Sequence, residues 1–212
     1  MEYKNFDDIS LQEFINLCKS EHAKEKIGLG GNKKIQLCTG EQVRICVCDF
    51  NHDVKENGIK ANTTLIFDFP LDGEFTMNKS FSNIGGWNDS YMNNILMPRF
   101  FKLLPEELQN AIVTVEKKTS IGNYKNIIKT TLNKLFLMSE VEINGTINYS
   151  IKGEGEQYEL FKKDSNKIDC SEYFWLRSPC SESDTSFCYV FNGKIYNNFA
   201  NSGNCVRLAF CL

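Results

Sequence analysis

The residues of this chain best suited to catalysis are its two histidines and nine cysteines. His52 is followed directly by Asp53, and a histidine oriented by a carboxylate can activate a cysteine nucleophile. Adjacent residues of a strand point to opposite faces, however, and the segment 50–53 is also typical of a turn after a strand. We therefore expect a protein that is not an enzyme, and we keep a Cys-dependent enzyme that uses His52 as the alternative.

Three of the cysteines could form a thiolate cluster, because Cys46 and Cys48 would share one face of a strand with Cys38 across a hairpin. The sequence contains no Cys-x-x-Cys motif, however, and only two histidines could supply imidazole ligands. The number of cysteines is odd, and the segment 1–14 is acidic and polar, unlike a secretory signal. We therefore expect reduced, mostly buried thiols, no metal ion and no cofactor.

Two arginines flank the segment that is the best candidate for a binding surface. Arg177 follows the aromatic residues Phe174 and Trp175, which would desolvate a guanidinium group, so we expect it to be buried and bonded to backbone carbonyls. Presentation of its guanidinium to a ligand carboxylate is the alternative. Arg207 is expected to belong to the exposed surface.

The segment between these arginines, about 180–207, is rich in tyrosine, asparagine, serine and glycine. This composition is typical of paratopes, in which tyrosine supplies rigid amphipathic area and asparagine and serine supply adaptable hydrogen bonds. The same residue types also suit solvated turns, which is the alternative. The ligand-binding residues that we expect are Tyr189, Asn192, Tyr196, Asn197, Asn198, Asn201, Asn204 and Arg207.

The composition excludes two classes of partner. The 212 residues carry a formal net charge of -3, from 24 basic and 27 acidic residues, and neither sign forms a long block. A nucleic acid or an anionic membrane surface would call for a basic patch. No window approaches the ~18 apolar residues of a membrane span. We expect a cytoplasmic protein, or one carried on a phage particle.

The elements that must position these residues indicate an α+β fold. Ser10 and Glu13 match a capping box, which predicts a helix over about 11–25. Further helices are expected at 87–104, bent or broken near Pro98, and at 105–112, 139–143 and 155–163. Strands are expected at 34–38, 42–50, 65–69, 113–117, 134–138, 173–177, 187–191 and 206–211. The pattern predicts a mainly antiparallel sheet with N-terminal and central helices. We expect a single domain over 1–212, with a helical segment at 1–30.

Several phrases of the sequence follow one another in a characteristic order. They are Gly85–Tyr91, Leu104–Gln109, Lys134–Glu142, Gly153–Glu159, Phe174–Pro179, Phe187–Val190 and Ala209–Cys211. In this order the chain resembles an uncharacterised domain family of Gram-positive gut bacteria and their prophages. The resemblance implies a C-type-lectin-like fold over 31–212, of the group that includes the sulfatase-modifying factors, in which the first and last strands pair.

Two features invite comparison with metal sites of that fold group. Trp87-Asn88-Asp89 spells a calcium-binding tripeptide of true C-type lectins, but Asn or Asp is also needed as a helix N-cap, and we expect the cap. Cys205 and Cys211 resemble the copper-binding cysteine pair of the formylglycine-generating enzymes. On one continuous strand they would lie about 20 Å apart, which is too far to share a metal ion.

The sequence therefore favours a non-catalytic recognition module that binds a glycan or a protein through the segment 180–207. The first alternative is the Cys-dependent enzyme on the same fold. The second is an intracellular assembly domain, in which the Tyr/Asn surface would be a contact between subunits of a homo-oligomer.

Overall fold

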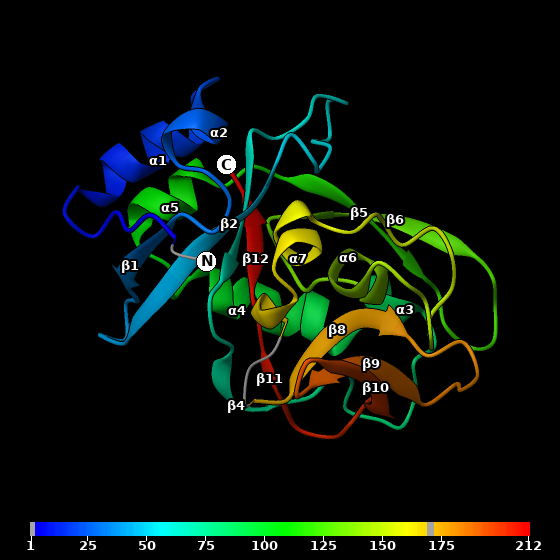
Figure 1. Cartoon of the computed structure of the whole chain (residues 1–212). Helices are drawn as coiled ribbons and strands as arrows, with labels where there is room; N and C mark the ends of the chain where they lie inside the picture. Colours follow the sequence, from blue (N-terminus) through cyan, green and yellow to red (C-terminus); the bar gives the residue numbers. More distant parts are fainter. Residues whose placement is uncertain (1–2, 169–171) are drawn as a thin grey trace.

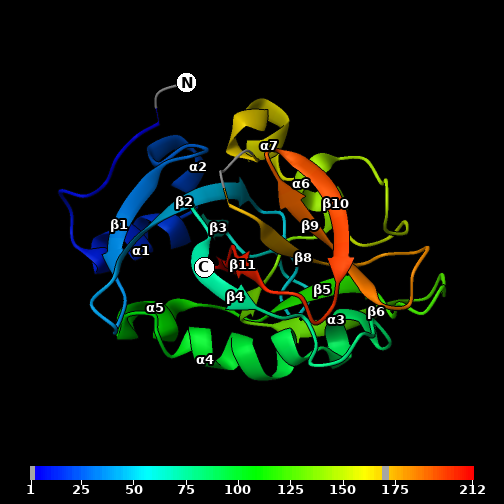
Figure 2. The same cartoon turned by 90° about the horizontal axis from the view of Figure 1, so that it is seen from below.

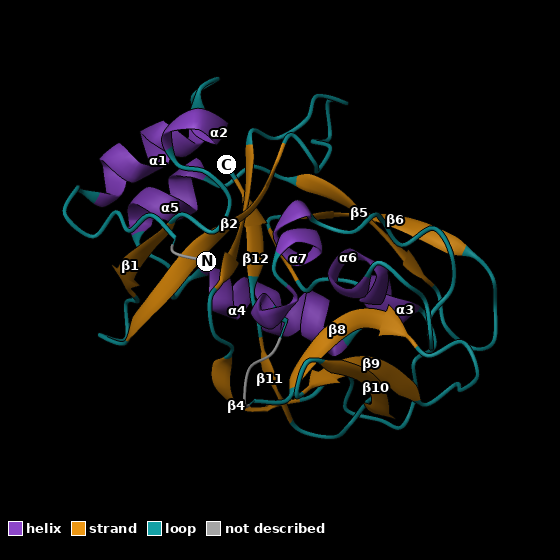
Figure 3. Cartoon of the chain, viewed as in Figure 1, coloured by secondary structure: helices purple, strands orange, loops and turns teal. Residues whose placement is uncertain are grey.

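The computed structural model describes residues 3–168 and 172–212. They form a mixed α+β structure in which 23% of residues are helical and 32% lie in strands. Two five-stranded sheets and a two-stranded ribbon are present in this part of the chain, and their pairing is mainly antiparallel. Figure 3 shows the helices distributed around these sheets. The predicted α+β class, with N-terminal and central helices, is confirmed.

The described chain begins with two helices, α1 (Leu11–Lys19) and α2 (Ala23–Lys26). The predicted capping box is present: Ser10 Oγ accepts a hydrogen bond from the Glu13 N–H, and the Glu13 carboxylate accepts one from the Ser10 N–H. Helix α1 is shorter than the expected 11–25. It ends because the backbone is extended at Ser20, whose hydroxyl donates to a carbonyl of the last turn.

The first sheet holds the C-terminal strand in its interior. In spatial order its strands are β1 (Asn32–Gln36), β2 (Gln42–Phe50), β3 (Thr63–Phe67), β12 (Ala209–Cys211) and β7 (Leu135–Phe136). Strands β1 and β2 form the predicted hairpin. Because β12 lies between β3 and β7, segments more than 140 residues apart in sequence are neighbours (Figure 1). The sheet is therefore incomplete until the last residues of the chain are in place.

The central helices run along one side of the molecule (Figure 2). They are α3 (Gly86–Asp89), the π-helix η1 (Met92–Leu96), α4 (Met97–Phe101) and α5 (Glu106–Ala111). The helix expected over 87–104 is interrupted at Ser90, where the backbone is extended, and a break at Pro98 is not observed, because η1 continues directly into α4. Pro98 cannot donate a backbone hydrogen bond, and the turn before it widens so that the Met97 N–H reaches back to the Met92 carbonyl.

The segment 87–89 does not cap a helix. Asn88 and Asp89 lie inside α3, and the N-cap position is occupied by Gly85, whose φ of 87° is in the left-handed region that favours glycine. The expectation that Asn88 or Asp89 would be the cap is therefore wrong.

A two-stranded ribbon follows, formed by β5 (Val115–Ser120) and β6 (Ile128–Asn133). The sequence predicts β5 approximately but treats the segment of β6 as a polar excursion between strands. Strand β6 was missed because most of its residues are exposed or half-buried, so it lacks an apolar alternation. After β7 come the short helices α6 (Glu140–Asn144), α7 (Glu159–Lys163) and η2 (Ser165–Lys167).

The second sheet contains most of the C-terminal segment. In spatial order its strands are β10 (Lys194–Phe199), β9 (Ser186–Phe191), β8 (Phe174–Pro179), β11 (Asn204–Val206) and β4 (Leu71–Phe75). The single strand expected at 206–211 is wrong, because the chain leaves this sheet after β11 and enters the first sheet as β12. Cys205 and Cys211 consequently belong to different sheets.

A cluster of buried apolar side chains connects the two sheets and extends from Phe14 in α1 to Leu212. Its largest fully buried members are Trp87 and Trp175. In the described part of the chain, none of the helices combines the length and the apolar character needed to cross a membrane.

Candidate functional site

The hairpin of β9 and β10 carries the centre of the surface that the sequence singles out. Its turn consists of Asn192 and Gly193, with φ values of 47° and 69°, the left-handed conformation that a two-residue type I′ turn requires. This turn sets Tyr189 directly opposite Tyr196 on the neighbouring strand. Paired residues point to the same face of a sheet, so the two tyrosines lie side by side.

Four rings form what we call the aromatic surface: Tyr173, Tyr189, Phe191 and Tyr196. Tyr173 stacks on Phe191 with ring centroids 4.2 Å apart and planes 9° from parallel. Tyr189 lies 5.8 Å from Tyr196 and 6.2 Å from Tyr173. Tyr173 is 46% exposed and Tyr196 is 38% exposed, whereas the other two rings are half-buried. The rings are thus held against one another and remain accessible from outside.

Trp175 borders the aromatic surface on the same face of the sheet, because it pairs with Tyr189 across β8 and β9. This side chain is fully buried, its indole N–H donates to the Phe75 carbonyl at 2.7 Å, and its ring meets the Tyr189 ring edge-on at 6.3 Å. On the opposite face of the hairpin, Val190 and Ile195 are buried in the core. The rings therefore rest on a rigid sheet.

The other expected residues of the segment are dispersed. Asn198 lies on the same side of β10 as Tyr196, and its Oδ1 accepts a hydrogen bond from Ser202 Oγ at 3.2 Å. Asn197 is exposed on the opposite side of the strand. Asn192 is exposed in the turn, and Asn201 is half-buried in the loop after β10.

Two expected surface residues are buried instead. Arg207 is 2% exposed, and its three guanidinium nitrogens donate to the backbone carbonyls of Phe67, Asp68 and Lys167. It therefore joins the segments after β3 and around η2, and the expectation that it lies on the exposed surface is wrong. Asn204 is 7% exposed and lies in the β11 strand.

A separate cavity of about 480 Å³ lies between the segment 49–54, strand β5 and the segment 154–162. Its floor contains a chain of ion pairs that alternate in sign. Lys117 Nζ is 2.6 Å from an Asp53 oxygen and 2.7 Å from a Glu142 oxygen. Arg177 binds both oxygens of Glu142, with Nη2 2.8 Å from Oε1. These four charged side chains are almost completely buried.

The electrostatics of the floor follow from this pairing. Burial alone would raise the pKa of Asp53, but Lys117 and hydrogen bonds outweigh it and lower that pKa to about 2. Burial also acts to raise the pKa of Glu142, and Arg177 with Lys117 holds it below its ordinary value. Arg177 makes further bonds to the carbonyls of Leu137 and Glu154. The expected structural role of Arg177 is therefore confirmed.

Glu154 lies at the end of this network and contacts neutral donors. Its carboxylate accepts hydrogen bonds from the Ser120 N–H at 2.8 Å and from the Ser178 hydroxyl. Burial raises the pKa of Glu154 to about 7, and these two hydrogen bonds oppose the rise only in part. Glu154 thus changes its protonation state near neutral pH.

His52 also borders the cavity, but its partner is not the adjacent carboxylate. Its Nδ1 is 3.0 Å from Asp49 Oδ2, whereas Asp53 binds Lys117. Burial would lower the pKa of His52, but the hydrogen bond with Asp49 and the nearby acidic groups raise it above its ordinary value. No hydrogen bond joins His52 to a cysteine within the described residues. The alternative pair considered from the sequence, His52 with Asp53, is therefore not formed, and His52 pairs with Asp49 instead.

Sequence reasoning missed several residues of both sites. Tyr173 and Phe191 belong to the aromatic surface. The alternation of aromatic residues along β8 and β9 could have predicted that they share a face with Tyr189. Lys117, Glu142 and Glu154 belong to the charged floor. Glu142 and Glu154 lie within the phrases 134–142 and 153–159, which the structure brings together around Arg177.

The described cysteines behave mainly as core residues. Seven of the eight are buried, Cys38 is exposed, and all eight are free. The prediction of mostly buried thiols is confirmed for these eight, whereas Cys170 lies outside the described residues. Burial raises the pKa of the thiols of Cys48, Cys188 and Cys211 well above the ordinary value.

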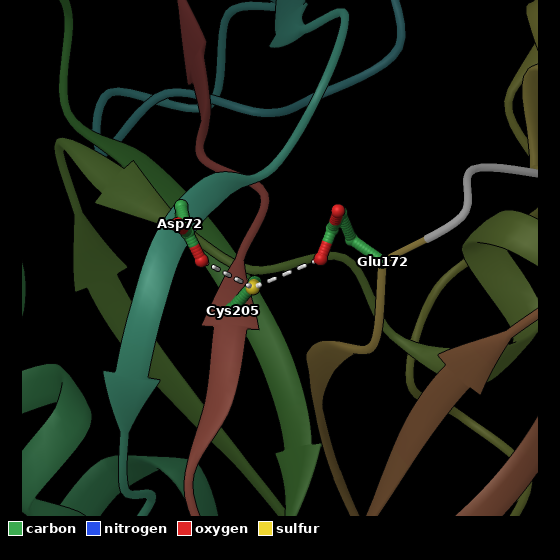
Figure 4. A group of neighbouring side chains, drawn as sticks. All are labelled: Asp72, Glu172 and Cys205. Atoms are coloured by element: carbon green, nitrogen blue, oxygen red, sulfur yellow. Dashed lines mark hydrogen bonds between the residues drawn. The ribbon is translucent and has the colours of Figure 1, made fainter.

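One group of side chains within the described ranges has the ligand types and spacing for a metal ion. Asp72, Glu172 and Cys205 place one atom each within 4.8 Å of one another (Figure 4). Cys205 Sγ lies 3.8 Å from Asp72 Oδ1 and 3.9 Å from Glu172 Oε2. Burial raises the pKa of Cys205, which favours the neutral thiol, whose one S–H can donate to either carboxylate, over the thiolate that a metal requires.

Comparison with known proteins places the chain in a family. The family model described as "Domain of unknown function (DUF6273)" matches residues 61–212, and the chain belongs to this family. No curated protein matches the chain. No solved structure matches it either.

Proposed function

We propose that this member of the DUF6273 family is a non-catalytic recognition module that binds a carbohydrate chain on the aromatic surface. The observation that supports this proposal is the set of four mutually packed rings on the outer face of a rigid antiparallel sheet. Partly exposed tyrosines are otherwise costly to leave in water, because their rings are largely apolar.

The packing of the rings favours binding. Each ring is already oriented by a neighbour, Tyr173 by Phe191 and Tyr196 by Tyr189. A ligand that stacks on them does not have to immobilise flexible side chains, so little conformational entropy is lost on binding. Such preorganisation is expected of a recognition surface.

The size of the aromatic surface favours a carbohydrate over a protein. A whole Tyr or Phe side chain presents about 150–250 Å², and the most accessible rings here are 46% and 38% exposed. Four such rings offer roughly 150–400 Å², at most about half of the ~800 Å² that each partner contributes to a standard protein interface. A few sugar units, whose apolar faces stack on flat rings, would cover this area.

Polar groups at the margin would complete the recognition. The hydroxyl groups of the three tyrosines can donate and accept hydrogen bonds, and the amides of Asn192 and Asn198 lie on the same hairpin. Asn197 lies on the other face, so we leave it out of the site. The proposed ligand-binding residues are therefore Tyr173, Tyr189, Phe191, Asn192, Tyr196 and Asn198.

The state of the thiols supports a binding role over the Cys-dependent enzyme. A catalytic cysteine must reach the thiolate form, and burial disfavours this form for Cys48, Cys188 and Cys211. His52 is held by Asp49, and its hydrogen bond is with a carboxylate instead of a thiol.

The finer parts of the sequence resemblance remain proposals. We propose the C-type-lectin-like fold group because the C-terminal strand β12 returns to the sheet of β1, β2 and β3. Within the described strands β12 pairs with β3 and β7 and not with β1, so the expected pairing of the first and last strands over 31–212 is wrong. The resemblance supports, as part of this proposal, an origin in gut bacteria and their prophages and a place in the cytoplasm or on a phage particle.

A glycan array tests the proposed function. We expect the wild-type protein to bind a subset of oligosaccharides, and Tyr196→Ala to reduce that binding at least tenfold, because it removes an exposed ring from an edge strand. Phe69→Ala is the matched control, since Phe69 is 67% exposed and outside the aromatic surface. Failure of the wild type to bind any glycan, or equal binding by Tyr196→Ala, would contradict the proposal. So would binding of a protein by the same residues without any glycan.

A further inference from the structure

We propose that the cavity beside His52 is a second binding site, which takes a small zwitterion with one carboxylate and one ammonium group, such as a free amino acid. The inference is independent of the aromatic surface. It rests on three observations. The His52 imidazole is held in place and has one nitrogen without a hydrogen bond to the described residues, the charged side chains of the floor are already paired with one another, and the opening carries charges of both signs.

The imidazole of His52 is fixed on two sides. Nδ1 is engaged by Asp49, and Asp49 is itself held by the backbone N–H groups of Phe50 and Glu159 at 2.7 and 3.0 Å. The His52 ring packs on the Tyr158 ring with centroids 4.2 Å apart. Nε2 has no hydrogen-bond partner within residues 3–168 and 172–212, so it is available to a molecule in the cavity.

The floor of the cavity cannot provide the recognition. Lys117 already donates to Asp53, Glu142 and Tyr158. Arg177 uses its guanidinium nitrogens on Glu142, Thr119 and backbone carbonyls. A ligand that displaced these bonds would leave a buried charge unpaired, at a cost of several kcal/mol. The floor therefore acts as a rigid base, and a ligand must bind to groups nearer the opening.

The groups at the opening carry both signs of charge. Lys60, Lys118, Glu116 and Glu156 border the cavity, and none of the four forms an ion pair within the described ranges; Lys60, Lys118 and Glu156 are exposed. Lys162 is paired with Glu159 at 2.8 Å, and His52 with Asp49. A ligand of a single sign would be attracted by the free lysines and repelled by the free glutamates, or the reverse. A zwitterion can be complementary to both.

The volume of the cavity is suited to a small ligand. A cavity of about 480 Å³ lies within the range of roughly 300–1,000 Å³ for small-molecule sites. A free amino acid with a side chain of moderate size fits into this volume together with bridging water molecules. The carboxylate would accept from Lys60 or from a protonated Nε2, and the ammonium group would donate to Glu156.

The two histidines allow a direct test by NMR. In a His22→Gln variant of the full chain, His52 gives the only histidine side-chain signals. The common L-amino acids are added singly, and L-alanine is compared with propionate and ethylammonium, which each lack one of its charged groups. We expect at least one amino acid to shift the His52 Cε1–H signal in a saturable manner. Propionate and ethylammonium should require at least tenfold higher concentrations than L-alanine.

Two variants separate this site from a general effect of charge. Lys60→Ala and Glu156→Ala should each weaken the binding of the amino acid at least fivefold, whereas Lys24→Ala, which removes an exposed lysine of α2, should leave it unchanged. The proposal is overturned when no amino acid shifts the His52 signal. It is also overturned when propionate acts as strongly as L-alanine, or when neither rim variant weakens binding.

Discussion

At the scale of residues, Glu154 differs from the other acids of the charged floor because its carboxylate forms no ion pair within the described residues. It is fully buried and bonded to an amide and a hydroxyl. Its pKa of about 7 lies above the ordinary value of 4.5, so the folded state binds a proton that the unfolded state releases between these two values. By linkage, this group makes the protein less stable as the pH rises from about 4.5 to about 7.

We predict that Glu154→Gln removes this part of the pH dependence. A glutamine can accept from the Ser120 N–H and donate to the Ser178 hydroxyl, as the protonated acid does. Relative to wild type, the free energy of unfolding of the variant should rise by roughly 3 kcal/mol between pH 4.5 and pH 7. Urea unfolding of both proteins at several pH values measures this difference. A difference that does not change with pH would contradict the prediction.

His52 also changes the stability of the protein in this pH range, but its contribution cancels when wild type and Glu154→Gln are compared. Its raised pKa means that its contribution to stability is present below about 6.5 and is lost as the pH rises through the folded value. Both proteins retain His52, so only the effect of Glu154 appears in the difference between them.

Single residues were predictable where the local sequence determines their environment. Arg177 follows a run of aromatic residues on a central strand, and its burial could be inferred from that run. Arg207 stands where the chain passes from one sheet to the other, and no local pattern reveals such a crossing. The partner of His52 was missed because a turn brings Asp49, three residues earlier, to its Nδ1.

At the scale of elements, two helices begin with the same capping box in different surroundings. Ser10 begins α1 at the surface, and Ser139 begins α6 in the interior. Ser139 Oγ also contacts the Glu154 carbonyl at 3.0 Å, and its box partner Glu142 binds Arg177. The second box is therefore part of the charged floor as well as a cap.

The two capping boxes differ in burial, so replacing the serine of each gives a matched pair of variants. We predict that Ser10→Ala lowers the free energy of unfolding by about 1 kcal/mol, the usual effect of losing an N-cap. Ser139→Ala should lower it by about 2–4 kcal/mol, because it leaves the buried Glu142 N–H without its partner and removes one of the two hydrogen bonds to the Glu154 carbonyl. Chemical denaturation measures both. Equal losses in the two variants would show that the buried box has no role beyond capping.

Helices and turns that are determined by a few neighbouring residues could be predicted from the sequence, whereas the residues at which the elements end were predicted less accurately. The capping box and the Asn192-Gly193 turn each act over a few residues, and each has the predicted effect. Pro98 follows a widened turn but does not break the helix. Strand β6 and the break between β11 and β12 depend on tertiary pairing, which has no local signal in the exposed segment 128–133 or in the apolar segment 204–212.

At the scale of the whole molecule, the family match and the folded structure have different boundaries. The match begins at residue 61, but strand β2 (Gln42–Phe50) pairs along β3, and Asp53 neutralises the buried Lys117. The prediction that residues 1–212 form one domain stays a prediction, and the shared hydrophobic cluster supports it.

We predict that a chain of residues 61–212 alone does not fold cooperatively. It would expose one long edge of β3 and leave Lys117 without Asp53, a loss of several kcal/mol in a protein of ordinary stability. Thermal unfolding followed by circular dichroism should show no sharp transition, in contrast to the full chain. A cooperative transition in the shorter chain would contradict this account of the first sheet.

The central claim is that the aromatic surface binds a carbohydrate, and isothermal titration tests it most directly. The oligosaccharide with the strongest signal on the array is titrated into wild type, Tyr196→Ala and the control Phe69→Ala. Loss of one stacking ring should cost about 1–2 kcal/mol, so we predict a Kd roughly tenfold higher for Tyr196→Ala and an unchanged Kd for Phe69→Ala. The same Kd for wild type and Tyr196→Ala would contradict the claim.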